Sequence, residues 1–165
     1  MSSKQVVAAI SVVALLVILV YPALSTGNVS LALKANRIPN ADHVYIKVKS
    51  VWVHQAGQSS DQGWELIFNS SLTIDLMTLV NDSQLIKGIA PVANYDSMRF
   101  DVSNVTWTYH GTSTPIQLES TQLIAHIDFR VTASRDIPLS VVVTGRSDVL
   151  QGQTFFLATL VATLS

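Results

Sequence analysis

The chain has 165 residues, of which 48% are hydrophobic and 13% are charged, with a formal net charge of -1 and no cysteine. This length fits one domain of ordinary size with a short appendage. So few charges exclude a disordered acidic or basic tail protein, and a near-neutral chain lacks the basic face that a nucleic-acid partner requires. Without cysteine, disulfides, thiolate metal ligands and a thiol nucleophile are excluded as well.

The first 25 residues form a segment addressed to a membrane. A lysine precedes the apolar run Val6–Val20, which only Ser11 interrupts. A basic start, an apolar stretch and small residues ending at Ser25 are typical of a secretory signal peptide. As a helix, residues 6–24 would also extend roughly 28 Å, about the thickness of a bilayer core. We therefore predict an apolar α-helix within residues 1–26.

Three roles for this helix stay open: a cleaved signal peptide, a membrane anchor, and the filament-core helix of a pilin-like subunit. Apolar residues on every side suit lipid and a helical bundle equally well. The pilin interpretation has a weakness, because only Lys4-Gln5 stands where a processing signal is usual. All three roles place residues 27–165 outside the cytoplasm, either secreted or at the cell surface.

From Asn28 onward the apolar residues follow a period of two, which predicts half-buried strands. The clearest example is Leu123–Val131. Within Val44–Val53 the apolar parity changes near Ser50, which predicts a β-bulge or a strand that bends from one sheet to another. The stretch Asp75–Lys87 lacks alternation, so we expect a short helix or an irregular crossing there. The expected strands are 28–34, 44–53, 64–68, 72–74, 97–102, 105–109, 115–118, 123–131, 139–144 and 154–164, with turns at 57–63, 110–113 and 145–148.

Many short strands separated by turns predict a single β-sandwich over residues 27–165. The last expected strand runs almost to Ser165, so we expect it to belong to the fold. Deletion of Thr154–Ser165 is therefore predicted to abolish folding.

Five segments carry a family resemblance by their order and spacing. They are Val29–Leu31, His43–His54, Gly63-Trp64, Ile74–Leu79 and Pro91–Phe100. Together they resemble DUF4382, an exported prokaryotic domain of unknown function, whose corresponding segments are a strand ending in His, a Gly-Trp turn, an Asp-Leu-Leu segment and Pro-x-Gly-x-Tyr-x-x-Ile-Arg-Leu. The resemblance covers roughly Gly27 to Val105. It implies an immunoglobulin-like or transthyretin-like antiparallel sandwich without assigned catalytic residues.

This chain departs from the family pattern at two places. Ala93 replaces a preferred glycine, and Ala35–Pro39 replaces the usual Asp-Ala-Pro after the first strand. We therefore expect the turn before Tyr95 and the first loop to differ from those of the family.

The sequence offers no catalytic motif. The histidines His43, His54, His110 and His126 lie in separate segments without metal-ligand spacing, so we expect no metal site, and His54 is expected to cap a strand or bond a nearby turn. No Gly-x-Ser-x-Gly elbow is present, and the scattered acids do not suggest a glycosidase pair. We predict neither an enzyme nor a cofactor.

Two charges lie in the most apolar surroundings of the body. They are Asp75, within Leu72–Leu79, and Arg99, between Met98 and Phe100. Charges are seldom buried without a partner. We therefore predict that both are structural groups held by hydrogen bonds or ion pairs.

Four Asn-x-Ser/Thr sequons, at Asn28, Asn69, Asn81 and Asn104, are more than this composition would supply by chance. They suggest a glycosylated surface protein.

Aromatic residues raise a further possibility, a platform for sugars. Trp107 and Tyr109 share a strand face with Val105, which favours core packing over a carbohydrate platform.

Two functions follow. The first is a non-enzymatic structural subunit of the cell surface, which contacts the membrane or other copies of itself through residues 6–24. Its copies could also pair through edge strands, including insertion of Asn28–Lys34 into a neighbour. The second is a secreted module that binds polysaccharide or metal, with surface glycans as partners. The N-terminus of the mature protein discriminates between them.

Overall fold

The computed structural model describes residues 25–150 and 153–165. The predicted N-terminal helix lies outside these residues, except at its last two positions. Within the described part, no helix is long and apolar enough to cross a membrane. The elements are β1 (Thr26–Ala35), β2 (His43–Gln55), β3 (Trp64–Phe68), β4 (Leu72–Asp75), the 3-10 helix η1 (Thr78–Val80), β5 (Gln84–Pro91), β6 (Asn94–Tyr109), β7 (Thr112–Leu118), β8 (Gln122–Arg130), β9 (Asp136–Leu150) and β10 (Gln153–Leu164).

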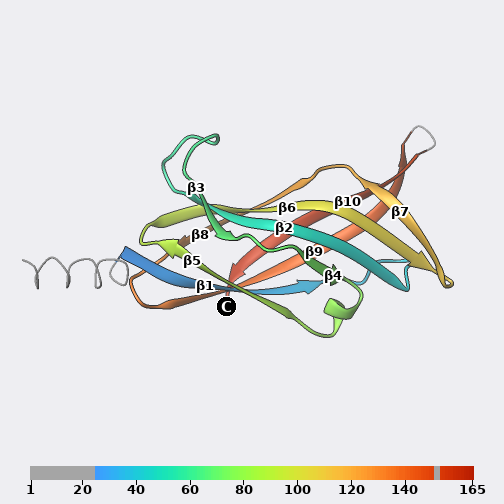
Figure 1. The fold of residues 1–165 in the computed structure, drawn as a ribbon, viewed down its shortest axis with the longest axis horizontal. Helices are drawn as coiled ribbons and strands as arrows, with labels where there is room; N and C mark the ends of the chain where they lie inside the picture. Colours follow the sequence, from blue (N-terminus) through green and yellow to red (C-terminus); the bar gives the residue numbers. More distant parts are fainter. Residues whose placement is uncertain (1–24, 151–152) are drawn as a thin grey trace, which may run out of the picture.

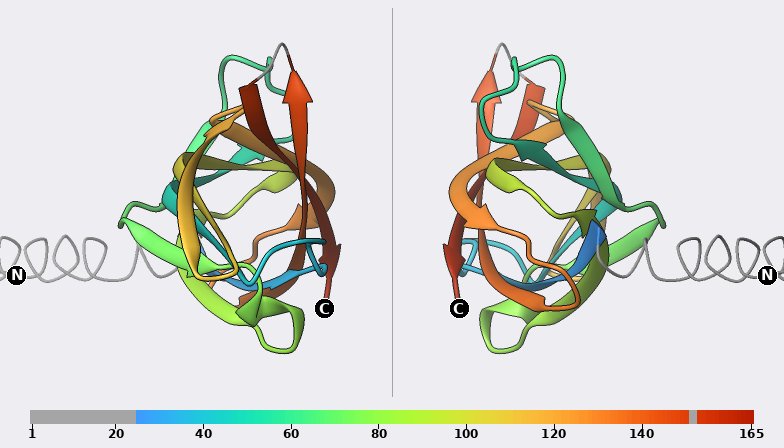
Figure 2. Two further views of the ribbon diagram at one scale, coloured as in Figure 1. Left: turned by 90° about the vertical axis from the view of Figure 1, so that its right-hand side faces the viewer. Right: turned by 90° about the vertical axis from the view of Figure 1, so that its left-hand side faces the viewer.

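These strands form one sheet that rolls into a nearly closed, barrel-like sandwich (Figures 1 and 2). The strand order is β3-β2-β6-β7-β10-β9-β1-β5, with β4 beside β2 and β8 beside β6. The two ends of this order, β3 and β5, lie against each other. Their backbones are so close at Gly88 that a Cβ added there would collide with the carbonyl of Ile67. The body is therefore mainly β, as predicted.

The sheet is mixed, so the predicted antiparallel pairing is correct for most neighbouring strands but not for all of them. β1 is antiparallel to β5 but parallel to β9, and β7 is parallel to β10. Apolar alternation marks a strand, but it does not encode the direction of its neighbour. The Asn28–Lys34 segment pairs on both sides within its own chain.

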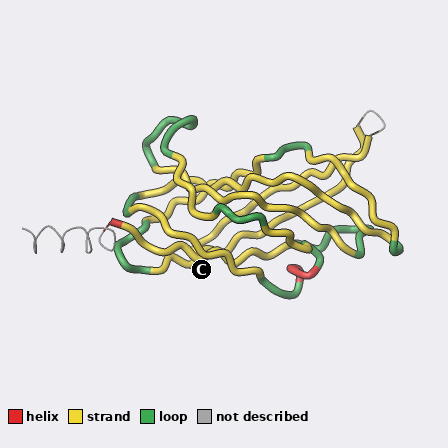
Figure 3. Tube along the Cα trace, viewed as in Figure 1, coloured by secondary structure: helices red, strands yellow, loops and turns green. Residues whose placement is uncertain are grey.

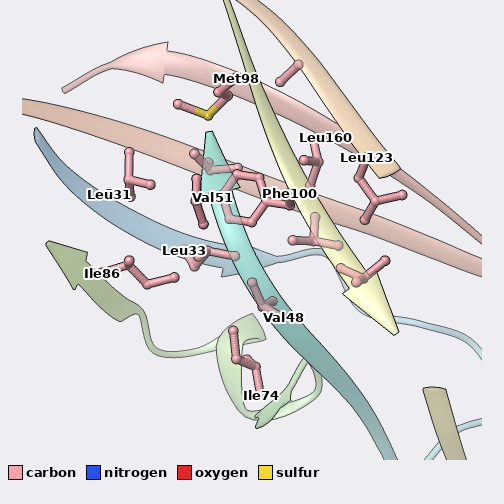
Figure 4. Close-up of a cluster of buried hydrophobic side chains, with 14 of the residues drawn as sticks. Leu31, Leu33, Val48, Val51, Ile74, Ile86, Met98, Phe100, Leu123 and Leu160 are labelled. Atoms are coloured by element: carbon pink, nitrogen blue, oxygen red, sulfur yellow. The ribbon is translucent and has the colours of Figure 1, made fainter. Parts of the chain in front are cut away.

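One apolar core fills the interior of the roll (Figure 4). Leu31 of β1, Phe100 of β6 and Leu139 of β9 are almost wholly buried. The predicted alternation in β8 is confirmed, since Leu123, Ala125 and Phe129 are buried and the residues between them are exposed or half-buried. Trp107 is also part of this core.

The predicted irregularity in β2 is confirmed. Its register with β6 shifts between Ile46 and Val48 and again between Val48 and Ser50. The first half of β2 pairs with β4 and the second half with β3. The parity change thus lets one strand serve two neighbours.

Three expectations need correction (Figure 3). Residues 97–102 and 105–109 belong to one long strand, β6. Residues 145–148 continue β9 and do not turn, since β9 pairs with β10 over twelve positions. The stretch Asp75–Lys87 holds η1, as one alternative expected, but also the start of β5, which the sequence pattern missed.

The expected turn between β6 and β7 is a tight one. His110 and Gly111 have φ values of 48° and 75°, and Tyr109 pairs with Thr112. Two successive positive φ angles are typical of the type I′ hairpin turn, in which glycine is favoured.

Candidate functional site

A polar and aromatic surface covers the outer side of β2, β6 and β8. The register of these antiparallel strands places chemically active side chains from distant parts of the sequence next to each other. One row consists of His54, Ser97 and His126, and the next of Trp52, Arg99 and Ile124.

His54 is the most constrained group of this surface. Its side chain is buried, with Nδ1 2.8 Å from Oδ1 of Asp96 and Nε2 3.0 Å from the carbonyl of Ser59. Both partners are acceptors, so the protonated, positively charged ring can donate to both, whereas a neutral ring can donate to one of them. The hydrogen bond to Ser59 and then the one to Asp96 raise the pKa of His54, although burial opposes them.

Asp96 carries the opposite charge. Burial alone would raise the pKa of this carboxyl group, but the hydrogen bonds from His54 and Ser97 outweigh it and lower the pKa. The two residues therefore form a hydrogen-bonded ion pair between β2 and β6 when His54 is protonated. The separate bond from His54 to Ser59 fixes the loop after β2 to the sheet.

Arg99 lies between two tryptophan rings. Its Cζ is 4.6 Å from the ring centre of Trp64 and 5.2 Å from that of Trp52, within the range of cation–π attraction. Trp64 also packs against His54 at 4.9 Å and donates from Nε1 to the carbonyl of Ser60. Arg99 thus packs on both tryptophan rings, and Trp64 in addition connects it to His54.

The charge of Arg99 is balanced by Asp101. Arg99 Nε lies 3.1 Å from Asp101 Oδ1, but the geometry is that of an ion pair without a hydrogen bond. The other oxygen of Asp101 accepts from Ser50 Oγ at 2.8 Å and Trp52 Nε1 at 2.7 Å. Arg99 thus has an ionic partner, in the way that its apolar neighbours in the sequence suggested.

Asp75 belongs to a different cluster, at the end of β4. Its carboxylate accepts from His43 Nδ1 at 2.7 Å, from Thr78 Oγ1 at 3.2 Å and from the backbone N–H groups of Val44 and Met77. Burial acts to raise its pKa, yet these four hydrogen bonds together lower it. Asp75 ties β4, β2 and the start of η1 together.

An open pocket of about 610 Å³ lies beside the His54 row and includes Trp64, Asp96, His126 and Asp128 in its wall. His126 Nδ1 is 3.0 Å from Ser97 Oγ, a contact that could in principle begin a nucleophile–base pair. Ser97 is itself buried, and within the described residues no carboxylate bonds to His126. The same part of the chain has no group of three or more His, Asp or Glu side chains placed to hold a metal ion.

The sequence did not reveal this grouping. Asp96 follows His54 by 42 residues, and His126 follows Ser97 by 29 residues. Only the strand register brings them together, and no short motif marks it. His110 lies apart from this surface, in the β6–β7 turn.

All four sequon asparagines are exposed. Asn69 follows β3 and Asn81 follows η1, whereas Asn28 and Asn104 lie within β1 and β6. The hydroxyl of Ser30, the third residue of the first sequon, is committed to hydrogen bonds with Asp136.

The fold and this surface define a class of protein: a barrel-like β-sandwich domain whose outer face is built around a His–Asp and an Arg–Trp cluster. A family model described as a domain of unknown function (DUF4382) matches residues 26–149, and the chain belongs to this family. The match extends past Val105, where the resemblance in the sequence ended, and takes in most of β9. The comparisons found no similar curated protein and no similar solved structure.

Proposed function

We propose that this protein is a non-enzymatic structural protein of the cell surface, connected to a membrane or to neighbouring copies through residues 6–24. The observation that carries the proposal is the place of β1. The apolar segment is separated from β1 by Ser25 alone, and β1 lies between β5 and β9 in the sheet (Figure 1).

This position suits a strand that bears load. β1 pairs with β5 over Thr26–Leu33 and with β9 over Asn28–Ala35. Inter-strand hydrogen bonds run across the strand direction, so a pull along β1 from its N-terminal end loads all of them in shear together. A segment anchored before Ser25 would therefore transmit force to the middle of the body.

Further features agree with a structural role. The charged groups His54, Asp96, Arg99, Asp101 and Asp75 bond to one another or to the backbone and so hold the body together. Low overall charge limits repulsion between identical subunits. Exposed sequon asparagines suit a glycosylated surface. We also keep as a proposal the relation to immunoglobulin-like or transthyretin-like sandwiches.

Strand exchange offers a route to self-association. Exchange of β1 between two copies would form the same ladders with β5 and β9 that β1 forms within one chain. Asn36–Asp42, the connection from β1 to β2, would act as the hinge.

The test compares the full chain with two variants, each tagged at the C-terminus and produced in a prokaryotic cell. Leu16→Asp places a charge in the apolar segment, and Leu85→Asp places the same charge at an exposed position of β5 as a control. We expect the wild type and Leu85→Asp in the envelope or in filaments, with residues 6–24 retained in the mature mass. Leu16→Asp should leave this fraction.

Three measurements decide the outcome: cell fractionation, mass spectrometry of the mature N-terminus and electron microscopy. A monomer in the medium that begins near Thr26 would contradict anchoring and favour the secreted binding module. Intact protein in the cytosol would contradict export altogether.

A further inference from the structure

A second pocket lies between the β6–β7 hairpin, the β9–β10 hairpin and the connection from β1 to β2. Among the described residues, β7 and β10 pair at two positions, Gln117 with Phe155 and Leu118 with Phe156. Within the same part of the chain, no ladder partner on that side is recorded for the earlier residues of β7. The pocket beside them is open, has a volume of about 650 Å³ and is lined from β6, β7, β9 and β10.

Two aromatic rings shape this pocket. Trp107 is 9% exposed, donates from Nε1 to the carbonyl of Asn40 and packs edge-on against Phe156. Tyr109 is 45% exposed, and the ring of His110 supports it at 4.0 Å. The structure thus offers a fixed buried wall and an exposed ring held in place from one side.

The polar groups around these rings are neutral and uncommitted. The side chains of Asn40, Thr114, Gln117 and Ser147 line the pocket, are exposed, and make no hydrogen bond with any described residue. The lining contains no Lys, Arg, Asp or Glu. A charged ligand would therefore find no counter-charge among the lining groups.

We propose that this pocket binds a neutral sugar unit of a polysaccharide or glycan. Amide and hydroxyl side chains both donate and accept, which matches the hydroxyl groups of a sugar. The exposed ring of Tyr109 offers an apolar surface for the C–H face of the same sugar. An added peptide strand fits less well, because Pro115 in β7 has no N–H to give to a neighbouring strand.

This inference does not rest on the proposed structural role, since an anchored protein and a secreted one would use the same pocket. Trp107 and Tyr109 have different parts in it. Trp107 belongs to the core and builds the wall, as its alternation predicted, whereas Tyr109 on the same strand face reaches the solvent.

The experiment measures the binding of defined tetrasaccharides to the full chain by isothermal titration calorimetry in a zwitterionic detergent without sugar groups. Maltotetraose, cellotetraose, mannotetraose and chitotetraose are the neutral probes, and tetragalacturonate is the anionic one. We expect at least one neutral probe to bind and tetragalacturonate to bind more weakly. Tyr109→Ala should weaken the neutral probe about tenfold, which corresponds to about 1.4 kcal/mol.

Tyr45→Ala is the matched control. Tyr45 is 38% exposed and stacks on His43, as Tyr109 packs on His110, but it is outside this pocket. Its removal should leave affinity unchanged. Gln117→Ala, at an exposed position of β7, supplies a second test with little risk to folding and should also weaken binding.

Four results would overturn the inference: no neutral probe binds, tetragalacturonate binds best, Tyr109→Ala and Gln117→Ala both bind like the wild type, or Tyr45→Ala weakens binding as much as Tyr109→Ala. Thermal melting of each variant verifies that it is folded. Filament or membrane association of these variants should not change, so failure here is distinguishable from failure of the proposed structural role.

Discussion

At the scale of single residues, His54 of β2 bonds to Asp96 of β6 and to Ser59 in the loop between β2 and β3, and the protonated ring can donate both hydrogen bonds. Arg99 packs on the ring of Trp64, which also contacts the ring of His54. The charge of the His54 ring is therefore coupled to the position of the β2–β3 loop and to the packing of Trp64. Stability should depend on pH through this residue.

The pKa of His54 is raised in the folded state, so the folded protein holds this proton more tightly than the unfolded chain. The resulting stabilisation is complete below about pH 6.5 and is lost as the pH rises through the raised value. We expect the urea midpoint to fall as the pH increases above neutrality, and to fall less in His54→Gln. His126→Gln is the control, since it removes a histidine from the same pocket. An unchanged decline in His54→Gln would contradict this assignment.

At acid pH, the dependence of stability on pH has the opposite sign. Asp75 and Asp96 have lowered pKa values, so the stability they contribute is present above their ordinary value of 3.8 and is lost as the pH falls through the lowered values. Together with His54, they place the range of greatest stability between these limits.

Apolar neighbours in the sequence were enough to predict that Asp75 and Arg99 have partners, because unpaired charges are costly in such surroundings. Some partners are close in the chain, since Asp101 lies two residues from Arg99 and Thr78 lies three residues from Asp75. The others, His43 and Trp64, reach these charges through strand pairing, which the sequence pattern does not reveal.

At the scale of elements, alternation predicted most strands because one face of each packs on the core. β5 was missed because Leu85 and Ile89 are apolar yet exposed, so its buried Ile86 and Ala90 do not stand out. The extension of β9 was missed because 145–148 has the composition of a turn. Its long ladder with β10 overrides that local preference.

Gly145 in β9 shows what that ladder requires. A Cβ there would collide with the ring of Phe156, which is wholly buried and cannot move away. We expect Gly145→Ala to lower the free energy of unfolding by about 1–3 kcal/mol, because overpacking forces the core to shift. Urea denaturation measures the effect, with Ser147→Ala as an exposed control in the same strand.

A double variant separates a clash from a general weakening of β9. Phe156→Leu removes the ring that the new methyl group meets, so the two changes together should cost less than the sum of their separate effects. Simple additivity would show that the cost of Gly145→Ala has another origin.

At the scale of the whole molecule, β10 connects the two parts of the roll. It pairs with β9 over Gln153–Leu164 and meets β7 at Phe155 and Phe156. Deletion of Thr154–Ser165 should therefore abolish cooperative folding, because it opens the core and breaks the path from β7 to β9. Circular dichroism and thermal melting test this expectation, with deletion of Ser165 alone as the control. A soluble truncation with a cooperative transition would contradict it.

The sequence predicted a mainly β body but not its closure. Period-two patterns report which face of a strand is buried, whereas the parallel pairs β1–β9 and β7–β10 and the contact of β3 with β5 depend on the path of the whole chain. Likewise, the sequence pattern places Trp107 and Tyr109 on the same strand face. Only the fold shows that the ring of Trp107 is buried and that the ring of Tyr109 is exposed to solvent.

The approach of β5 to β3 determines where the native structure opens locally. Gly88 lets the two backbones touch at Ile67, yet the strand order ends there, and no ladder between the described strands joins β3 to β5. Opening between β3 and β5 would separate packed surfaces without breaking the hydrogen bonds of a strand pair. We therefore expect this opening to have the lowest free-energy cost of any in the roll. Deuterium would therefore enter the backbone amides on this side long before those of β1, which has a neighbour on each flank.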